Sequence, residues 1–284
     1  MSVIEPTVST RPSGTGGSGS GSGSQAAAEG GEFFATSWAL VRRNVIGISR
    51  LPSALIPSLI FPIFGTIAFS SLYGAAIRQY FPTLNALNWF VPINAMQGAA
   101  FSGVFLAFGA IRDFETGIID RLLAAPLHRR ALLFSSVLTA AVRSVIPFAF
   151  VMIIGLFGGM TIPGGAFAGI ICLLIATVGT AVLGSMWGMG LAYRFKSMAA
   201  APLMQLGVFV LVFLSATQVP MEGLSGWLHG FARINPATNI LRLGRQGFLG
   251  DVTWHDTWPG LLAIAGMGAA LTLFADRGLK KLTP

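Results

Sequence analysis

Charged side chains are concentrated in one short stretch of this chain, residues 114–130, which read FETGIIDRLLAAPLHRR. From Arg112 to Arg130 seven of nineteen residues are charged, against twenty-eight in all 284. Three acids lie toward the start of this region, and two arginines lie at its end. This order of charge stabilises a helix through its dipole. The stretch therefore predicts a short helix that carries opposite charges at its two ends.

An apolar stripe gives this expected helix a second face. Ile118, Ile119 and Leu122 recur at helical spacing, and Pro126 should end the helix. An ordinary cytoplasmic loop needs positive charge only. Acids beside an apolar stripe are instead typical of a helix that docks in a groove of another protein. We therefore expect a docking element here, with the ordinary loop as the alternative.

Residue types that catalyse reactions or bind metals are few and scattered. His128, His229 and His255 share no metal-ligand spacing, and Cys172 is the only cysteine. The Gly/Ser tract at 13–24 is no phosphate-binding loop, because it lacks the lysine that such a loop needs. We expect no catalytic residue, no metal and no cofactor in this chain.

The composition is that of a membrane protein. The chain is 54% hydrophobic and 10% charged, with a mean hydropathy of +0.73, whereas a soluble domain has roughly a quarter charged residues. About 20 apolar residues cross a membrane. The net charge of +8 marks cytoplasmic loops here rather than a nucleic-acid partner. An all-α membrane domain with six spans is predicted, at about 52–73, 91–111, 131–158, 166–191, 198–217 and 258–275.

The chain before the first span divides into two parts. Residues 1–31 are low in bulky side chains, so we expect a disordered Gly/Ser-rich tail. Residues 32–50 should form an interfacial amphipathic helix flanked by arginines, with a solvated lead-in as the alternative. Residues 51–284 would then form the six-span domain. One face of the expected helix carries Phe34, Trp38, Val41 and Val45.

Basic residues give the expected orientation. With six spans and both termini in the cytoplasm, fourteen of the eighteen Lys and Arg residues lie inside, as the positive-inside rule requires. The four outside are Arg78, Arg233, Arg242 and Arg245.

Arg143 conflicts with this map, because an arginine within the third span is costly in lipid. We expect the helix to start near Leu127 but to enter lipid only near Val145. At 1.5 Å per residue the stretch 127–143 would then project roughly 25 Å into the cytoplasm.

Two motifs resemble the ABC-2 type transporter permeases. The run FETGIIDRLLAAPLHRRALL is similar to that family's signature of an acid and a glycine followed by D/E-R-L-L-x-x-P-x-x-R. Residues 221–250, MEGLSGWLHGFARINPATNILRLGRQGFLG, resemble its last external loop, and Arg143 continues the likeness. The resemblance covers about residues 32–284. It is strongest to the daunorubicin-resistance DrrB-like permeases of actinobacteria. The external-loop motif corresponds here to Trp227, Asn235, Pro236 and Arg242.

The resemblance implies a permease that works with other subunits. Such permeases pair as homodimers or heterodimers and dock two ATP-binding subunits, which hold the ATP and Mg²⁺. The helix between the second and third spans is their coupling helix. Glu115, Asp120 and Arg121 would make polar contacts to the ATPase. The remaining residues of this expected ATPase-coupling element are Gly117 and Pro126 at the turns and Ile118, Ile119 and Leu122 at the packed face.

Polar residues within the spans are candidates for a substrate path, since the family lines its path with the second and fifth spans. Hydrogen bonding between helices is the equal alternative. Small residues such as Gly103, Ala107, Gly184, Gly188 and Gly190 indicate tight helix packing instead. The path candidates are the polar Gln97 and Gln205 together with three apolar neighbours on the same spans, Phe101, Met204 and Phe209.

The expected function is export of a hydrophobic or amphipathic molecule, drug-like or lipid, across the plasma membrane. Membrane lipids surround the chain, and ATP is hydrolysed in the partner. A polysaccharide or glycolipid exporter has the same fold and stays an alternative. An ion- or proton-coupled secondary transporter is the other alternative. Such proteins often carry ionisable residues at mid-membrane and internal repeats, whereas the predicted spans contain neither a carboxylate nor an obvious repeat.

Overall fold

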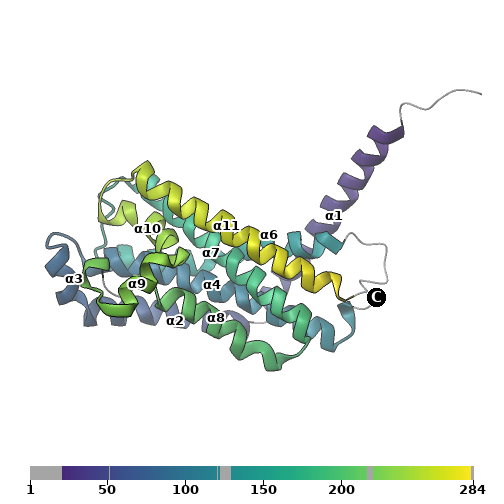
Figure 1. Cartoon of the computed structure of the whole chain (residues 1–284), viewed down its shortest axis with the longest axis horizontal. Coiled ribbons are helices and arrows are strands. Elements are labelled where there is room, and N and C mark those ends of the chain that lie inside the picture. The colour runs from purple at the N-terminus through teal and green to yellow at the C-terminus, as the bar shows by residue number, and fades with distance from the viewer. Residues whose placement is uncertain (1–20, 51, 120, 122–128, 216–219, 283–284) are drawn as a thin grey trace, which may run out of the picture.

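The computed structural model describes residues 21–50, 52–119, 121, 129–215 and 220–282. Helices make up the regular structure of these residues, so the predicted all-α class is confirmed. Long helices lie side by side along one axis (Figure 1). They are α1 (Gly21–Arg50), α2 (Pro52–Leu72), α3 (Gly74–Tyr80), α4 (Ala86–Glu115), α6 (Arg129–Phe157), α7 (Ala166–Phe195), α8 (Ala201–Phe213), α9 (Gly226–Ile234), α10 (Pro236–Leu249) and α11 (Trp254–Lys280), with single 3₁₀ turns at Met198–Ala200 and Met221–Gly223.

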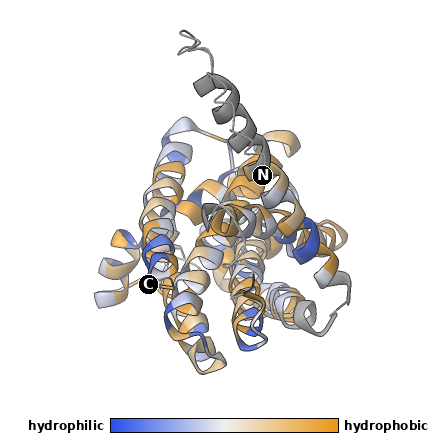
Figure 2. Ribbon diagram, turned by 90° about the vertical axis from the view of Figure 1, so that its right-hand side faces the viewer, coloured by the Kyte–Doolittle hydropathy of each residue, from blue (hydrophilic) through white to orange (hydrophobic). Residues whose placement is uncertain are grey.

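Four helices are long and apolar enough to cross a membrane: α4, α6, α7 and α11. A fifth span results if α2 and α3, which meet at a 68° bend, count as one broken span. Hydrophobic residues lie along most of these ribbons when the bundle is viewed along its axis (Figure 2). The predicted membrane protein is therefore confirmed, but six spans are not. The expected fifth span, 198–217, contains only the short helix α8, and residues 216–219 lie outside the described part of the chain.

The helix α4 forms the centre of the bundle and contacts α2, α6, α7, α8 and α10. All its side chains from Ala86 to Val104 are buried. Its first turn is capped by Asn85, whose side chain accepts a hydrogen bond from the Leu87 N–H. A helix that is apolar on all sides and buried in this way belongs in the core of a bundle.

The backbones of α4 and α7 touch because glycines replace larger residues at their contact. A Cβ atom on Gly103 would lie 2.2 Å from the Ala181 carbonyl oxygen, and one on Gly184 would lie 2.4 Å from the Ala100 carbonyl oxygen. Close approach through small residues is the usual way in which membrane helices associate. The expectation that these residues pack helices together is confirmed.

Asn88 joins three segments at one end of α4. Its side-chain amide donates hydrogen bonds to the Thr161 carbonyl at 2.8 Å and to the Phe248 carbonyl at 2.7 Å. Its side-chain oxygen accepts from the Thr161 N–H at 3.2 Å. Because Thr161 precedes α7 and Phe248 lies in α10, this buried side chain fixes both segments to α4.

The N-terminal helix begins earlier than expected. Helix α1 starts at Gly21 instead of Glu32, because the run Gln25–Ala28 consists of strong helix formers. Residues 1–20 of the expected tail lie outside the described residues. The predicted apolar face is divided: Val41 is buried, whereas Phe34 and Trp38 are more than 60% exposed.

A glycine substitution tests the α4–α7 contact. We expect Gly184→Ala to lower stability by about 1–3 kcal/mol, because the methyl group would overlap the Ala100 carbonyl. The matched control is Gly109→Ala in α4, where nothing lies within 4 Å of the added carbon. There the loss of backbone freedom in the unfolded chain should raise stability by about 0.5–1 kcal/mol. Thermal unfolding in detergent would measure both changes, and equal midpoints for the two variants would contradict the contact.

Candidate functional site

The charge-rich segment follows the end of α4. Gly117 has φ +69°, a conformation that suits glycine, and its N–H bonds to the Phe114 carbonyl at 3.0 Å. The chain therefore turns at Gly117, as predicted. Glu115 and Arg121 are exposed. Asp120, Leu122 and Pro126 lie outside the described residues.

The two isoleucines of the expected docking stripe differ in their surroundings. Ile118 and Ile119 are helical, as predicted. Ile119 is only 5% exposed, so this chain itself covers it, whereas Ile118 is 37% exposed. Of the described apolar residues in the segment, Ile118 is therefore the one available to a partner.

An ion pair holds α1 against the end of α4. The Arg43 guanidinium donates to the Asp113 carboxylate at 2.5 Å, and both side chains are partly exposed. Phe33 and Phe34 of the same helix contact the Phe134 ring in α6. Helix α1 is thus fixed to α4 and α6, the two helices that flank the charge-rich segment. Sequence reasoning missed this pair, because seventy residues separate its members.

Three aromatic rings meet where α2, α4 and α8 come together. The Phe101 and Phe209 ring centroids are 4.9 Å apart, and Phe61 lies 6.0 and 6.2 Å from them. Two of the path candidates are therefore in direct contact, and sequence reasoning missed Phe61 as their third member. Aromatic pairs at such separations contribute about 0.5–1.5 kcal/mol beyond burial.

The other path candidates are less alike. Gln97 is buried on α4, and Gln205 is partly buried on α8. Met204 is fully buried, and its carbonyl oxygen accepts a hydrogen bond from the Trp187 Nε1–H at 3.1 Å. That contact favours a packing role for Met204 rather than a position on an open path.

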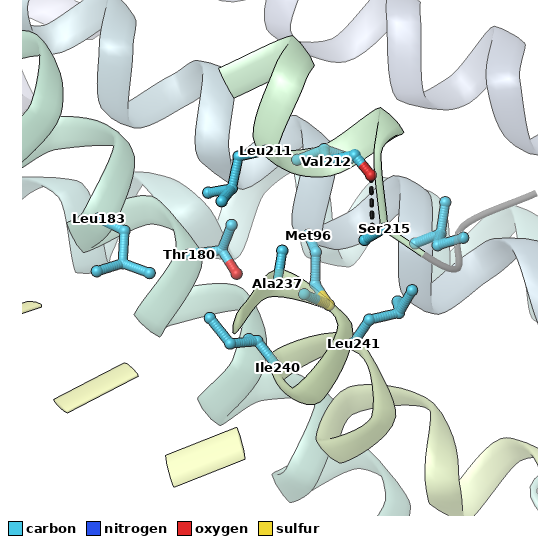
Figure 3. A pocket seen from close by; sticks show the side chains of 10 residues that line it. Met96, Thr180, Leu183, Leu211, Val212, Ser215, Ala237, Ile240 and Leu241 are labelled. Atoms are coloured by element: carbon cyan, nitrogen blue, oxygen red, sulfur yellow. Dashed lines mark hydrogen bonds between the residues drawn. The ribbon is translucent and has the colours of Figure 1, made fainter. Parts of the chain in front are cut away.

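A small apolar cavity lies between α4, α7, α8 and α10 (Figure 3). Its volume is about 20 Å³, which suffices for about one water molecule and not for a drug-sized ligand. The hydroxyls of Thr180 and Ser215 in its wall donate to the carbonyls of Ala176 and Val212. The remaining lining is hydrophobic, so this cavity is a packing defect rather than a binding site.

Arg143 was expected in a helix that projects into the cytoplasm and enters lipid only near Val145. In the structure its side chain is packed within the protein and is only 6% exposed. Its Nε and Nη2 atoms have no hydrogen-bond partner among the described residues. Gly98 of α4 packs against Pro147 of α6, so Arg143, one turn from Pro147, lies level with the middle of α4. Contacts between helices cover it instead of water.

The external-loop motif has a structural role in part. The Asn235 side chain accepts from the Ala237 N–H at 3.0 Å and donates to the Leu211 carbonyl at 2.8 Å. It therefore caps α10 and joins it to α8, while Pro236 occupies the first turn, where proline is favoured. Arg242 lies 4.0 Å from Asp256 at the start of α11. Trp227 is 74% exposed.

The two sets of residues occupy opposite ends of the bundle. The helices α3, α9 and α10 lie at one end, while α1 and the end of α11 lie at the other (Figure 1). Because Arg43 of α1 contacts Asp113, the charge-rich segment belongs to the second end. This arrangement separates the charge-rich segment from the external-loop motif by the length of α4.

Charge reversal tests the contact between α1 and α4. We expect Arg43→Asp to raise amide hydrogen exchange in residues 33–45 by about two- to fivefold, as the loss of one partly exposed ion pair predicts. The control Arg42→Asp makes the same change at the neighbouring exposed position. Exchange should return to the original rate in the double variant Arg43→Asp/Asp113→Arg. Equal effects of Arg42→Asp and Arg43→Asp would argue against a specific pair.

Comparison with known proteins gives the family of this chain. The ABC-2 type transporter family model matches residues 36–249, from α1 to the end of α10. The ycf38 protein of Cyanophora paradoxa is 28% identical over 214 residues, which are 72% of this chain and 71% of that protein. The daunorubicin resistance ABC transporter permease protein DrrB1 of Streptomyces coeruleorubidus is 24% identical over 235 residues, 80% of each chain. The probable multidrug ABC transporter permease YbhR of Escherichia coli (strain K12) is 28% identical over 202 residues, 67% of this chain and 53% of that protein. This chain belongs to the ABC-2 type transporter family.

Proposed function

We propose that this chain is the membrane subunit of an ABC exporter in the plasma membrane. It moves a hydrophobic or amphipathic molecule, drug-like or lipid, and ATP hydrolysis in a separate ATP-binding subunit supplies the energy. Both termini lie in the cytoplasm. The observation that carries the proposal is the exposed, charged segment after α4, with Glu115, Ile118 and Arg121 open to a partner in a chain of this family.

The ATP-binding subunit would contact this segment and act through α4. A helix of 30 residues is about 45 Å long, so one rigid element reaches from the docking segment to Asn88 at the opposite end. Asn88 is bonded both to α10 and to the segment before α7. Displacement of α4 at the docking end would therefore move these two segments at the opposite end. The tight α4–α7 contact supports this role, since two helices in backbone contact move together.

The cargo path would lie on the side of α4 that carries α2 and α8. The Phe61, Phe101 and Phe209 rings offer an apolar surface there. Both helices also have outward faces without a protein partner among the described residues. A second permease copy on these faces would enclose a path between the two subunits. The exposed residues are Ile60, Phe64 and Ile67 of α2 and Leu203, Leu206 and Val210 of α8.

The names of the relatives favour an amphipathic drug as the first cargo to test. DrrB1 is named for daunorubicin resistance, and YbhR is named as a multidrug permease. An apolar aromatic cluster is compatible with such a molecule. A glycan cargo would require polar groups along the path.

Coupling can be tested with the complex in proteoliposomes. The chain is co-purified with its ATP-binding subunit, and ATP hydrolysis and daunorubicin uptake are measured. We expect Ile118→Glu and Glu115→Arg each to lower both rates about tenfold or more, because each places an unfavourable charge at the docking surface. The control Arg233→Glu changes an exposed charge on α9 at the other end and should leave both rates unchanged.

Two results would contradict the proposal. One is normal ATP-driven uptake by both docking variants. The other is uptake by the chain alone, driven by a proton or sodium gradient, which would favour the secondary transporter.

A further inference from the structure

A second cavity, of about 350 Å³, opens at the end of the bundle formed by α3, α9 and α10. Its described lining includes two arginines, two aspartates and two aromatic rings: Arg242, Arg245, Asp251, Asp256, Phe81 and Trp89. The volume lies in the range of small-ligand sites. Neither the docking segment nor the Phe61, Phe101 and Phe209 rings take part in it.

The inner wall of the cavity contains a cation–π contact between Arg245 and Trp89. The Arg245 guanidinium carbon lies 3.5 Å from the Trp89 ring centroid, and the Phe81 ring is 5.6 Å from Trp89. Both Arg245 and Trp89 are at most 5% exposed. Burial lowers the pKa of Arg245, but stacking on a ring face favours the charged form, and an arginine stays protonated in proteins. A guanidinium that lies on a ring carries its N–H donors at its edge, in the geometry that binds a phosphate.

The outer wall carries negative charge. Asp256, in the first turn of α11, lies 4.0 Å from Arg242, so these two charges largely compensate each other. Asp251 follows α10 and is exposed. The cavity therefore offers a buried cation within and an exposed carboxylate at its mouth, a pattern that suits a ligand with an anionic group beside an amine.

Exposed tryptophans at this end indicate that the cavity lies at the level of the lipid headgroups. Trp227, Trp254 and Trp258 are 74%, 72% and 46% exposed, and they lie in α9 and at the start of α11, at the same end as the cavity. Exposed Trp side chains are enriched at the level of the lipid headgroups. The ligands nearest to the mouth of the cavity are thus phospholipid headgroups.

We propose that this cavity binds the headgroup of a phospholipid that combines a phosphate with a primary amine, as in phosphatidylethanolamine. The phosphate contacts Arg245 and Arg242 in the cavity, and the ammonium group contacts Asp251 at the mouth. With both termini in the cytoplasm, this end of the bundle faces the outer leaflet, and this placement alone rests on the proposed function. A bound headgroup would bridge α10 and α11, and α10 is joined to α4 through Asn88.

Lipid retention in native mass spectrometry tests this site. The full-length chain is released from nanodiscs that contain equal amounts of phosphatidylethanolamine and phosphatidylglycerol, and the lipids that remain bound are counted. We expect the chain to retain about two- to fivefold more phosphatidylethanolamine, the preference that one exposed ion pair with Asp251 would supply. Asp251→Asn should abolish this preference without loss of total lipid. Arg245→Gln should lower the retention of both lipids, and Arg242→Gln keeps this test available if the buried arginine is needed for folding.

The control Arg233→Gln removes an exposed charge at the same end but outside the cavity, and it should leave retention unchanged. The proposal is overturned if Asp251→Asn keeps the original ratio, or if Arg233→Gln acts as strongly as Arg242→Gln. It is also overturned if inorganic phosphate at a concentration equal to that of the lipid displaces the retained lipid, because the site would then prefer a free anion to a headgroup. The measurement needs no ATP hydrolysis, so its failure would leave the proposed export function untouched.

Discussion

The backbone contact between α4 and α7 is the constraint on which the rest of the structure depends. A lipid environment provides no hydrophobic force between apolar helices, so close packing must hold them together. Gly103 and Gly184 allow each helix to reach the other's carbonyl oxygens. This contact makes the two helices one unit, and the remaining helices are arranged around it. A larger residue at either glycine would separate the helices that the bundle needs most.

Polar side chains attach other segments to the two ends of α4, and the bonds differ in kind between the ends. At one end the buried amide of Asn88 satisfies backbone carbonyls of two other segments, a strong restraint because buried unpaired groups are costly. At the other end α4 is held by the partly exposed pair of Arg43 and Asp113, which contributes little free energy. The end of α4 that carries the charge-rich segment is thus held less firmly than the end that carries Asn88.

Sequence reasoning was accurate where a local pattern determines the structure. Long apolar runs predicted the helices α4, α6, α7 and α11, and the small residues predicted tight packing between helices. Gly117 was correctly placed at a turn. Sequence reasoning failed where the structure depends on contacts between segments that are distant in the chain. The pair of Arg43 and Asp113 joins residues seventy positions apart, and the bonds of Asn88 reach Phe248 in α10. A helical pattern carries no signal for either, since both depend on which helices become neighbours.

The position of Arg143 shows why energetic cost alone does not locate a charge. The cost of an arginine in lipid was taken to place it in the cytoplasm, although burial within protein also keeps a charge out of lipid. Gly98 lies against both Pro147 of α6 and Pro62 of α2, and Arg143 lies one turn from this three-helix junction. A buried guanidinium with two unpartnered nitrogens weakens the packing around it, because a polar group without a partner costs more than an apolar one. Pro62 lies within α2 and removes one hydrogen bond of that helix, whereas α7 contains no proline. We therefore expect α2 to be the helix that moves most easily. It packs on α4 and α6.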